Sequence, residues 1–575
     1  MQEQIGIVRP VAIAGTTSAR RVAGVLTVGL FAVLAVLLPA VALVKPPDHD
    51  EQMYVAAAAL LRQGAGLPYR DFHFFQMPVL ELVYAALFLL TDHLLLAARL
   101  LNAVLALSSL AILFALVRRR FRGAGDLAAL AAGAATVALV GGNGPVTFAA
   151  GLAWNHDLPV LLTLLAVGLF PGARPDHPLA AERATGKRVR RDKSRDYAQA
   201  GAGLGTRRTA RLVAAGAALG LAIGARLAFA PAVLPFLIAA ALPTPGEAGH
   251  TRARRATWLW GPGACGAGML LGLGPALALA APAPQAFLFD NLTYHLRNAA
   301  YWQAAGQTAA MTLPGKLAYM GDVLRAQPAC LGLLLAYALF ALPALVGVLR
   351  RGRGAAHGDL LLAATLAPCL MAGALVPTPT WYQYFYAPVP FLALAAALGQ
   401  GALSETAIRG PGRRVRWGLV ALGIAAGPAL INGAQVYTGY LRDGAFLQPA
   451  GWVPVQAHRA GVEIRQLLDA RATPGAGRRV LTLAPLYPLE GGLQIYPALA
   501  AGPFAWRVAP LLPAGERQAF HIAGSADLNA LVGADAPAAV LTGAEGNLEG
   551  ALIGYAQAHG YQPAHLSNGL TLWLR

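Results

Sequence analysis

Charged residues are scarce in this chain of 575 residues. Asp, Glu, Lys and Arg make up 13% of the sequence, whereas hydrophobic residues make up 57%. A soluble globular protein carries about 25% charged residues. The deficit, together with several long apolar runs, excludes a soluble globular protein and predicts a polytopic α-helical membrane protein.

Cysteine is also rare: the chain has only Cys265, Cys330 and Cys369. All three lie in or beside apolar runs, and their spacing matches no metal-ligand motif. We therefore expect small buried side chains there, and neither a disulfide framework nor a zinc site.

A phosphate-binding loop is missing as well. The glycine-rich segment Gly141-Gly142-Asn143-Gly144 lacks the Lys-Ser/Thr pair that completes such a loop. ATP-driven transport by this chain is therefore not expected.

The positive charges are concentrated between the apolar runs. The net charge is +18, and 28 of the 45 Lys and Arg residues fall in six segments. These are residues 9–21, 118–122, 174–211, 252–255, 350–353 and 409–416. Cytoplasmic loops of membrane proteins carry such an excess. The basicity therefore indicates topology rather than binding to nucleic acid.

The apolar runs predict eleven transmembrane spans, with the amino terminus in the cytoplasm and the carboxyl terminus outside. The first run is longer than the apolar core of a secretory signal, so we interpret it as an uncleaved anchor, although Ala40-Val41-Ala42 resembles a cleavage site. With these spans, every basic segment lies on the cytoplasmic side of the membrane. The predicted spans are 23–44, 96–117, 126–142, 147–170, 211–226, 228–243, 258–281, 328–349, 358–376, 382–399 and 417–437.

One apolar stretch, from Met77 to Thr91, is too short to cross a bilayer and contains Glu81. If it crossed, the basic run at 118–122 would lie outside, against the charge rule. We therefore predict a re-entrant or surface-lying helix, and one long outer loop over residues 45–95.

Two further segments differ from the transmembrane domain of residues 1–437. Residues 172–210 form a basic cytoplasmic loop without hydrophobic periodicity, which favours disorder or binding to anionic lipid headgroups. Residues 438–575 alternate short buried strands with helices, which predicts a small α/β domain outside the membrane.

Polar residues collect at the predicted outer surface. The segment Asp48-His49-Asp50-Glu51 follows the first span and begins an amphipathic helix. Acids there either compensate the helix dipole or serve a reaction, and Asp48 with Asp50 could bind a divalent cation such as Mg²⁺ or Mn²⁺. Other candidates at this level are Arg70, His73, Gln76, Asn155, His156, Asp157, Arg226, His295, Arg297, Tyr382 and Tyr384.

Several of these candidates also have a simpler interpretation. Arg226 either extends to the lipid headgroups or is a counter-ion for a lipid phosphate. The two tyrosines could belong to an interfacial aromatic belt, and the histidines to ordinary hydrogen-bonded loops. However, Asp157 and Arg226 lie beside or within apolar spans, where ionisable groups usually face an interior cavity. This favours one shared site.

Four segments carry a resemblance to a known family: Asp50-Glu51-Gln52-Met53-Tyr54, Phe75-Gln76-Met77-Pro78, residues 220–226, and Trp381 to Pro388. With the order of spans over residues 20–437, they resemble the glycosyltransferase-C superfamily, in its branch of protein O-mannosyltransferases and lipid A aminoarabinose transferases. The resemblance implies that Asp50 is the catalytic base, with Glu51 beside it and Asp157 in support, and that the reaction inverts the anomeric carbon.

The sequence departs from that family at two positions. Met77-Pro78 stands where the family has a pair of prolines, and Arg226 stands where it often has a lysine. Arginine can bind a phosphate through two parallel hydrogen bonds, so a phosphate contact is retained as an expectation.

The expected function is sugar transfer, hexosyl or pentosyl, at the outer face of the bacterial cytoplasmic membrane. Nucleotide sugars are cytoplasmic, so an outward-facing transferase needs a polyprenyl-phosphate sugar as donor. A carboxylate would accept the proton of an acceptor hydroxyl, and Arg226 with Arg70 or Arg297 would stabilise the leaving phosphate. The acceptor is an envelope lipid, a glycan or a protein.

Two other classes of protein are alternatives: a secondary transporter or flippase, and a non-catalytic scaffold. A transporter would place its ionisable residues near the bilayer midplane and usually shows internal repeats. Here the acids lie in outer loops and no repeat is visible, which favours the transferase.

Overall fold

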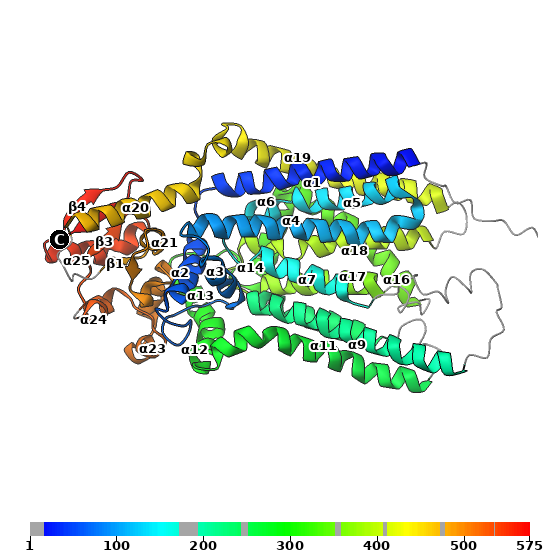
Figure 1. Ribbon diagram of the computed structural model, residues 1–575, viewed down its shortest axis with the longest axis horizontal. Helices are drawn as coiled ribbons and strands as arrows, with labels where there is room; N and C mark the ends of the chain where they lie inside the picture. Colours follow the sequence, from blue (N-terminus) through cyan, green and yellow to red (C-terminus); the bar gives the residue numbers. More distant parts are fainter. Residues whose placement is uncertain are drawn as a thin grey trace, which may run out of the picture.

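The computed structural model describes residues 17–171, 194–242, 251–350, 358–405, 411–471, 478–533 and 535–575. Its long helices run side by side in one bundle, and a smaller domain with a β-sheet lies at one end of that bundle (Figure 1). This is the fold class that the sequence predicts.

Among the residues that the structure describes, eight helical segments are long and apolar enough to cross a membrane. They are α1 (Thr17–Val44), α4 (Leu94–Phe121), α9 (Ser194–Ala225), α11 (Thr251–Ala280), α15 (Pro328–Ala336) continued by η4 (Tyr337–Ala341) and α16 (Leu342–Arg350), α17 (Gly358–Leu375), η6 (Tyr382–Tyr386) with α18 (Val389–Glu405), and α19 (Pro411–Leu441). Shorter apolar helices occupy the other three predicted positions, so the number of eleven spans stays a prediction. They are α5 (Asp126–Gly141), α7 (Asp157–Leu169), and η2 (Leu227–Ala232) with α10 (Val233–Ala241).

The predicted span over residues 147–170 is wrong as a continuous helix. The short helix α6 (Gly144–Ala149) ends before residue 150, and α7 begins only at Asp157. Gly151 between them has φ +80°, and a Cβ there would lie 2.9 Å from the Cβ of Ala42. The backbone amide of Ala153 donates to Glu51 at 2.7 Å. Hydrogen bonds to another segment thus replace helical ones and shape this loop of residues 150–156.

The predicted basic loop at 172–210 is only partly described. Residues 172–193 lie outside the described residues, and from Ser194 the chain is helical, as the first turns of α9.

Helices α9 and α11 pack with their backbones in close approach, because glycines lie at the contact. A Cβ at Gly216 or Gly220 of α9 would lie 2.1 Å from a backbone oxygen of α11, and Gly268 and Gly272 of α11 face α9 in the same way. Small residues four apart allow such packing between membrane helices. The contact fixes the end of α9, where Arg226 follows.

The predicted outer loop holds α2 (His49–Gln63) and α3 (Val79–Leu87). Helix α3 has nine residues, too few to cross a bilayer, as the sequence predicts. Helix α2 begins at a capping box of Asp48 and Glu51 and ends at Gly64 in the left-handed conformation. The other short elements between the long helices are η1 (Arg122–Ala124), α12 (Pro284–Leu288), η3 (Phe289–Thr293), α13 (Tyr294–Ala304) and α14 (Leu313–Ala326).

The carboxyl-terminal domain contains a five-stranded mixed sheet in the order β2-β1-β3-β5-β4. Strand β1 is parallel to β2 and β3, whereas β5 is antiparallel to β3 and β4. The strands are β1 (Arg479–Thr482), β2 (Gln494–Ile495), β3 (Ala539–Thr542), β4 (Gln562–His565) and β5 (Thr571–Leu574). The helices are α20 (Val453–Arg471), α21 (Leu486–Glu490), α22 (Pro503–Val508), α23 (Ala514–Ala519), α24 (Leu528–Val532) and α25 (Gly550–Ala558), with short 3₁₀ turns η7 (Ala445–Leu447), η8 (Pro449–Gly451), η9 (Pro497–Leu499), η10 (Ala509–Leu511), η11 (Ser525–Asp527) and η12 (Gly546–Glu549). Short strands thus alternate with helices in this domain, as the sequence predicts.

This domain is firmly docked on the helical bundle. Leu486, Phe504 and Val508 belong to the same buried hydrophobic cluster as the bundle helices. Glu490 accepts a hydrogen bond from the backbone amide of Leu95 at 2.7 Å, so the domain caps the start of α4. The domain is therefore part of one packed structure with the bundle.

Candidate active site

Asp50 lies in the first turn of α2, at the end of the bundle that carries the carboxyl-terminal domain (Figure 1). Its backbone amide donates to the carboxylate of the N-cap residue Asp48 at 2.9 Å. Its own half-buried carboxylate accepts no hydrogen bond and forms no ion pair within 4 Å with any residue that the structure describes. Asp50 is therefore positioned by the helix and left available to a substrate.

Some neighbouring charges raise the pKa of Asp50 and others lower it. Burial, followed by the negative charge of Asp48, raises the pKa of Asp50 to about 7. The positive charges of Arg507, Arg226 and His49 oppose this rise in the pKa. Two guanidinium groups thus lie close enough to affect Asp50 without forming an ion pair with it.

Arg226 directly follows α9 and is 9% exposed. Its Nη1 donates to Asn155 Oδ1 at 3.0 Å and lies 2.8 Å from Nδ1 of His156. Its guanidinium stacks over the ring of Tyr384 at 5.2 Å. Gln76 accepts a hydrogen bond from Asn155 at 3.1 Å, which joins the loop before α3 to the same cluster.

Arg507 of α22 approaches from the carboxyl-terminal domain. Its guanidinium carbon lies 4.5 Å from the ring centre of Phe504 and 5.0 Å from that of Trp302. Its Nη2 donates to Asn298 of α13 at 3.1 Å. No sequence pattern indicated Arg507, because it lies more than 450 residues after Asp50 in a different domain.

Glu51 is placed very differently from Asp50. Its side chain is fully buried and accepts hydrogen bonds from Arg99 Nε at 2.8 Å, Arg99 Nη2 at 2.5 Å and the amide of Ala153 at 2.7 Å. Arg99 also donates to the carbonyl oxygens of Ala42 and Lys45. This buried ion pair joins α1, α2, α4 and the loop 150–156, and it leaves Glu51 without access to a substrate.

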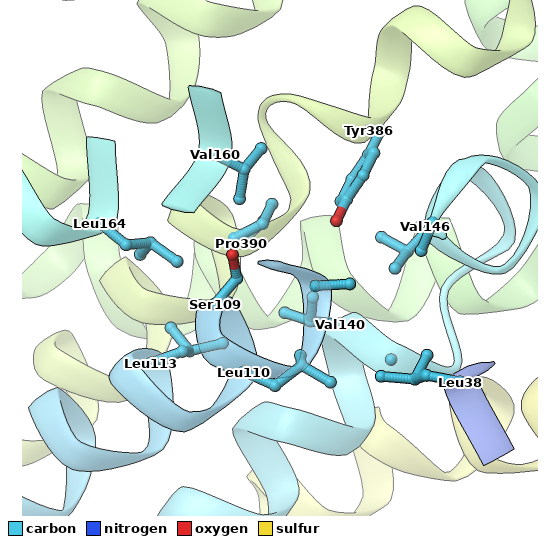
Figure 2. Close-up of a pocket in the computed structure, with 13 residues that line it drawn as sticks. Leu38, Ser109, Leu110, Leu113, Val140, Val146, Val160, Leu164, Tyr386 and Pro390 are labelled. Atoms are coloured by element: carbon cyan, nitrogen blue, oxygen red, sulfur yellow. The ribbon is translucent and has the colours of Figure 1, made fainter. Parts of the chain in front are cut away.

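Asp157 is also enclosed. It accepts hydrogen bonds from the amide of Gly151 at 2.9 Å and from the hydroxyl of Tyr386 at 2.7 Å. Figure 2 shows the Tyr386 hydroxyl beside an apolar cavity of about 10 Å³ that Ser109, Val146 and other side chains line. That volume holds about one water molecule and no sugar. Asp157 therefore holds the loop 150–156 in place through its hydrogen bond with Gly151, and it has no room beside it for a sugar.

Lys45, at the end of α1, supports the same loop. Its Nζ donates to the carbonyl oxygens of Thr147, Phe148 and Ala150 at 2.9, 3.1 and 3.2 Å. A cation near the carbonyls at the end of α6 is electrostatically favourable. Neither Lys45 nor Arg99 was recognised from the sequence, since each resembles an ordinary boundary residue of an apolar run.

The histidines among the candidates have mainly structural partners. His73 is buried with Nδ1 2.7 Å from Asp290 Oδ1, and the amide of Phe74 donates to Asp290 Oδ2 at 3.0 Å. His295 packs on the ring of Phe75, and burial lowers the pKa of His295 to about 4. At pH 7, His295 is therefore neutral and provides no charge for an anion.

Three other candidates lie apart from this cluster. Arg70 is paired with its neighbour Asp71 at 2.7 Å in an exposed loop, and Arg297 is exposed on α13. Tyr382 lines a separate cavity of about 400 Å³ between α6 and α19, together with Gln327 and Asn432. The cluster thus contains the predicted residues Asp50, Gln76, Asn155, His156, Arg226 and Tyr384, and it adds Arg507.

The predicted divalent-cation site does not fit this geometry. No group of three or more His, Cys, Asp or Glu side chains could hold a metal ion within the described ranges. The predicted pair, Asp48 and Asp50, provides only two carboxylates, and the Asp48 carboxylate already caps α2. A divalent cation such as Mg²⁺ needs more oxygen ligands than this pair provides.

Comparisons with known proteins give structural but no sequence relatives. No family model and no curated protein matches the chain. The crystal structure of ArnT from Cupriavidus metallidurans bound to undecaprenyl phosphate is 15% identical with a TM-score of 0.51, covering 95% of this chain and 97% of that one. Its apo form is 14% identical with a TM-score of 0.54, covering 96% and 98%.

A third similar structure is an oligosaccharyltransferase from Archaeoglobus fulgidus in complex with zinc and sulfate. It is 14% identical, with a TM-score of 0.47, and the match covers 95% of this chain and 73% of that one. The similarity to ArnT shows that the chain shares the ArnT fold, which agrees with the resemblance of its motifs to the glycosyltransferase-C superfamily.

Proposed function

We propose that this protein is a membrane glycosyltransferase that moves a sugar from a polyprenyl-phosphate donor to an acceptor hydroxyl, with Asp50 as general base. The observation that carries the proposal is the state of the three candidate acids. Glu51 and Asp157 are enclosed and hydrogen-bonded, whereas the Asp50 carboxylate has no partner among the described residues and lies near two guanidinium groups. A base needs such availability, and an anionic donor needs such cations.

The reaction follows from these positions. Asp50 accepts the proton of the acceptor hydroxyl as the hydroxyl oxygen forms a bond to the anomeric carbon. The bond between that carbon and the donor phosphate oxygen breaks, and its electron pair leaves with the polyprenyl phosphate. Arg226 stabilises the phosphate charge, and the resemblance to the superfamily implies that the anomeric carbon is inverted. The acceptor is an envelope lipid, glycan or protein.

The donor class is supported by the fold. ArnT, whose fold this chain shares, was crystallised with undecaprenyl phosphate. Arg226 directly follows a membrane helix, at the level where the phosphate of a lipid with its tail in the bilayer would lie. A secondary transporter or flippase is less well supported, because the unpaired acid lies at the end of the bundle rather than at its middle.

The direct test is transfer of label from donor to product. Membranes containing the protein are incubated with radiolabelled polyprenyl-phosphate hexoses and pentoses, and the label is followed from the lipid fraction into an acceptor. Label that crosses the membrane while remaining on the lipid would instead identify a flippase.

The side of the membrane can be determined by cysteine labelling. We propose that the carboxyl-terminal domain lies outside the cytoplasmic membrane, because the basic last turn of α4 lies at the other end of that helix from the capping residue Glu490. After the three native cysteines are replaced by alanine, Gln466→Cys should react in intact cells with a membrane-impermeant maleimide. Arg119→Cys should react only after permeabilisation. The reverse pattern would contradict the proposed orientation.

The raised pKa of Asp50 predicts a pH dependence for the transfer. Only the deprotonated carboxylate accepts a proton, so the rate should rise about tenfold per pH unit below about 7 and level off above it. Asp48→Asn removes the neighbouring negative charge and should move this limb to lower pH. Initial rates from pH 5.5 to 8.5 measure both. A flat profile over that range would argue against Asp50 as the base.

A further inference from the structure

We infer that Arg507 of the carboxyl-terminal domain and Arg226 of the membrane domain form one anion-binding site, which takes the phosphate of the lipid-linked donor. The inference rests on the proposed function and deepens it, because it makes the carboxyl-terminal domain a part of the site. Arg507 would bind the phosphate directly and carry half of the positive charge there.

The surroundings of Arg507 fix its position while leaving donors available. Its guanidinium lies against the rings of Phe504, Trp302 and Tyr301 at 4.5 to 5.5 Å. Its Nη2 donates to the side chain of Asn298, and the side chain of Tyr294 also lies within hydrogen-bonding reach of the guanidinium. Its Nε has no hydrogen-bond partner among the described residues. Stacking on aromatic rings holds a guanidinium plane in place and leaves N–H groups at its edge available to bind oxygen atoms of a phosphate.

A purely structural arginine would be expected to have a carboxylate partner. Arg99 illustrates this case, since it is bound to Glu51 at 2.5 Å. Arg507 forms no ion pair within 4 Å among the described residues, although its charge reaches Asp50. An anionic ligand would supply the negative partner that Arg507 lacks among the described residues.

Arg226 of the membrane domain and Arg507 of the carboxyl-terminal domain affect the pKa of the same residues. Both lower the pKa of Asp50, and both interact electrostatically with Tyr384 of η6. Arg226 is stacked on that tyrosine, whereas Arg507 is held by α13 and α22. One arginine from each domain thus lies near enough to act electrostatically on Asp50.

The docking of the carboxyl-terminal domain places Arg507 there. The hydroxyl of Tyr294 donates to the carbonyl oxygen of Phe504 at 3.0 Å, three residues before Arg507. His49, the residue before Asp50, binds Glu545 of the same domain at 2.9 Å, and this hydrogen bond raises the pKa of His49. The domain therefore contacts both α13 and the first turn of α2, on either side of the site.

The test measures binding without the reaction, using purified full-length protein in a neutral detergent. The probe is dodecyl phosphate, with dodecanol as the uncharged control and inorganic phosphate as a competitor. Trp302 beside Arg507 provides a fluorescence signal, and calorimetry provides an independent one. Wild-type protein should bind dodecyl phosphate, and competition by inorganic phosphate reports how much of the affinity belongs to the headgroup rather than to the lipid chain.

Arg507→Gln and Arg507→Met should each weaken the binding of dodecyl phosphate about 10–100-fold, as expected for loss of a charged hydrogen-bond donor. The methionine variant preserves packing against the rings and so guards against loss of the fold, which the thermal unfolding midpoint monitors. Arg465→Gln removes the same charge from an exposed position on α20 of the same domain and should bind like wild type. Arg226→Gln should weaken binding to a similar extent.

The binding experiment distinguishes a failure of the two-domain site from a failure of the proposed transferase function. Unchanged binding in either folded Arg507 variant, with loss in Arg226→Gln, overturns the two-domain site and leaves the proposed function standing. Absence of binding to wild-type protein counts against both. A second readout is the pH profile: loss of Arg507 should move the acid limb of transfer above pH 7, because one positive charge near Asp50 is lost, whereas Arg465→Gln should not move it.

Discussion

Asp50→Asn should lower sugar transfer by about 10²–10⁴-fold, the range that a general base contributes. Asparagine has the same shape but cannot accept the proton of the acceptor hydroxyl. The substitution removes no hydrogen bond or ion pair that the structure shows, because the Asp50 carboxylate has none among the described residues. The protein should therefore fold, insert and bind dodecyl phosphate at least as well as wild type. Single-turnover transfer from a radiolabelled donor measures the effect.

Asp48→Asn is the matched control for this prediction. Asparagine caps a helix as well as aspartate does, so the first turn of α2 should keep its geometry. At pH 8, above the acid limb, this variant should transfer within a fewfold of wild type. Comparable losses in both variants would assign the effect to the helix start rather than to a base. Full activity of Asp50→Asn would reject Asp50 as the base.

The different surroundings of Asp50 and Glu51 could not be predicted from the sequence. Both are acidic and adjacent, and the family motif contains both. Their surroundings differ because successive residues on an α-helix point in directions about 100° apart. One of them meets Arg99, which is 48 residues further along the chain. The motif indicates where the acids are, whereas packing decides which acid remains available.

The sequence predicts those features that leave a local pattern of residues, and it does not predict those that depend on contacts between distant residues. Hydrophobic runs, basic segments and the strand pattern are local, and they located most spans and the carboxyl-terminal domain. The break at residues 150–156 depends on a hydrogen bond from Ala153 to Glu51, and Arg507 depends on how a whole domain docks. Neither feature has a local signal, so neither could be predicted from one sequence.

The Glu51–Arg99 pair should contribute strongly to the stability of the end of the bundle that carries the carboxyl-terminal domain. Removing one partner of a buried ion pair leaves an uncompensated charge and typically costs about 3–5 kcal/mol. Arg99→Met should have an effect of this size, since it also removes donors to the carbonyl oxygens of Ala42 and Lys45. The unfolding midpoint of the purified protein in detergent and its resistance to denaturant measure the loss.

A double-mutant cycle tests whether the buried charge is the cause. Glu51→Gln combined with Arg99→Met leaves no charge and should be more stable than Arg99→Met alone, because the carboxylate no longer lacks a partner. The exposed pair of Arg325 and Asp322 provides the control: Arg325→Met should change the free energy of unfolding by about 1 kcal/mol or less. If Arg99→Met were no more destabilising than this control, the ion pair would not be what positions the first turn of α2. The availability of Asp50 would then need another explanation, because Asp50 is held in place by the same helix start that Glu51 anchors.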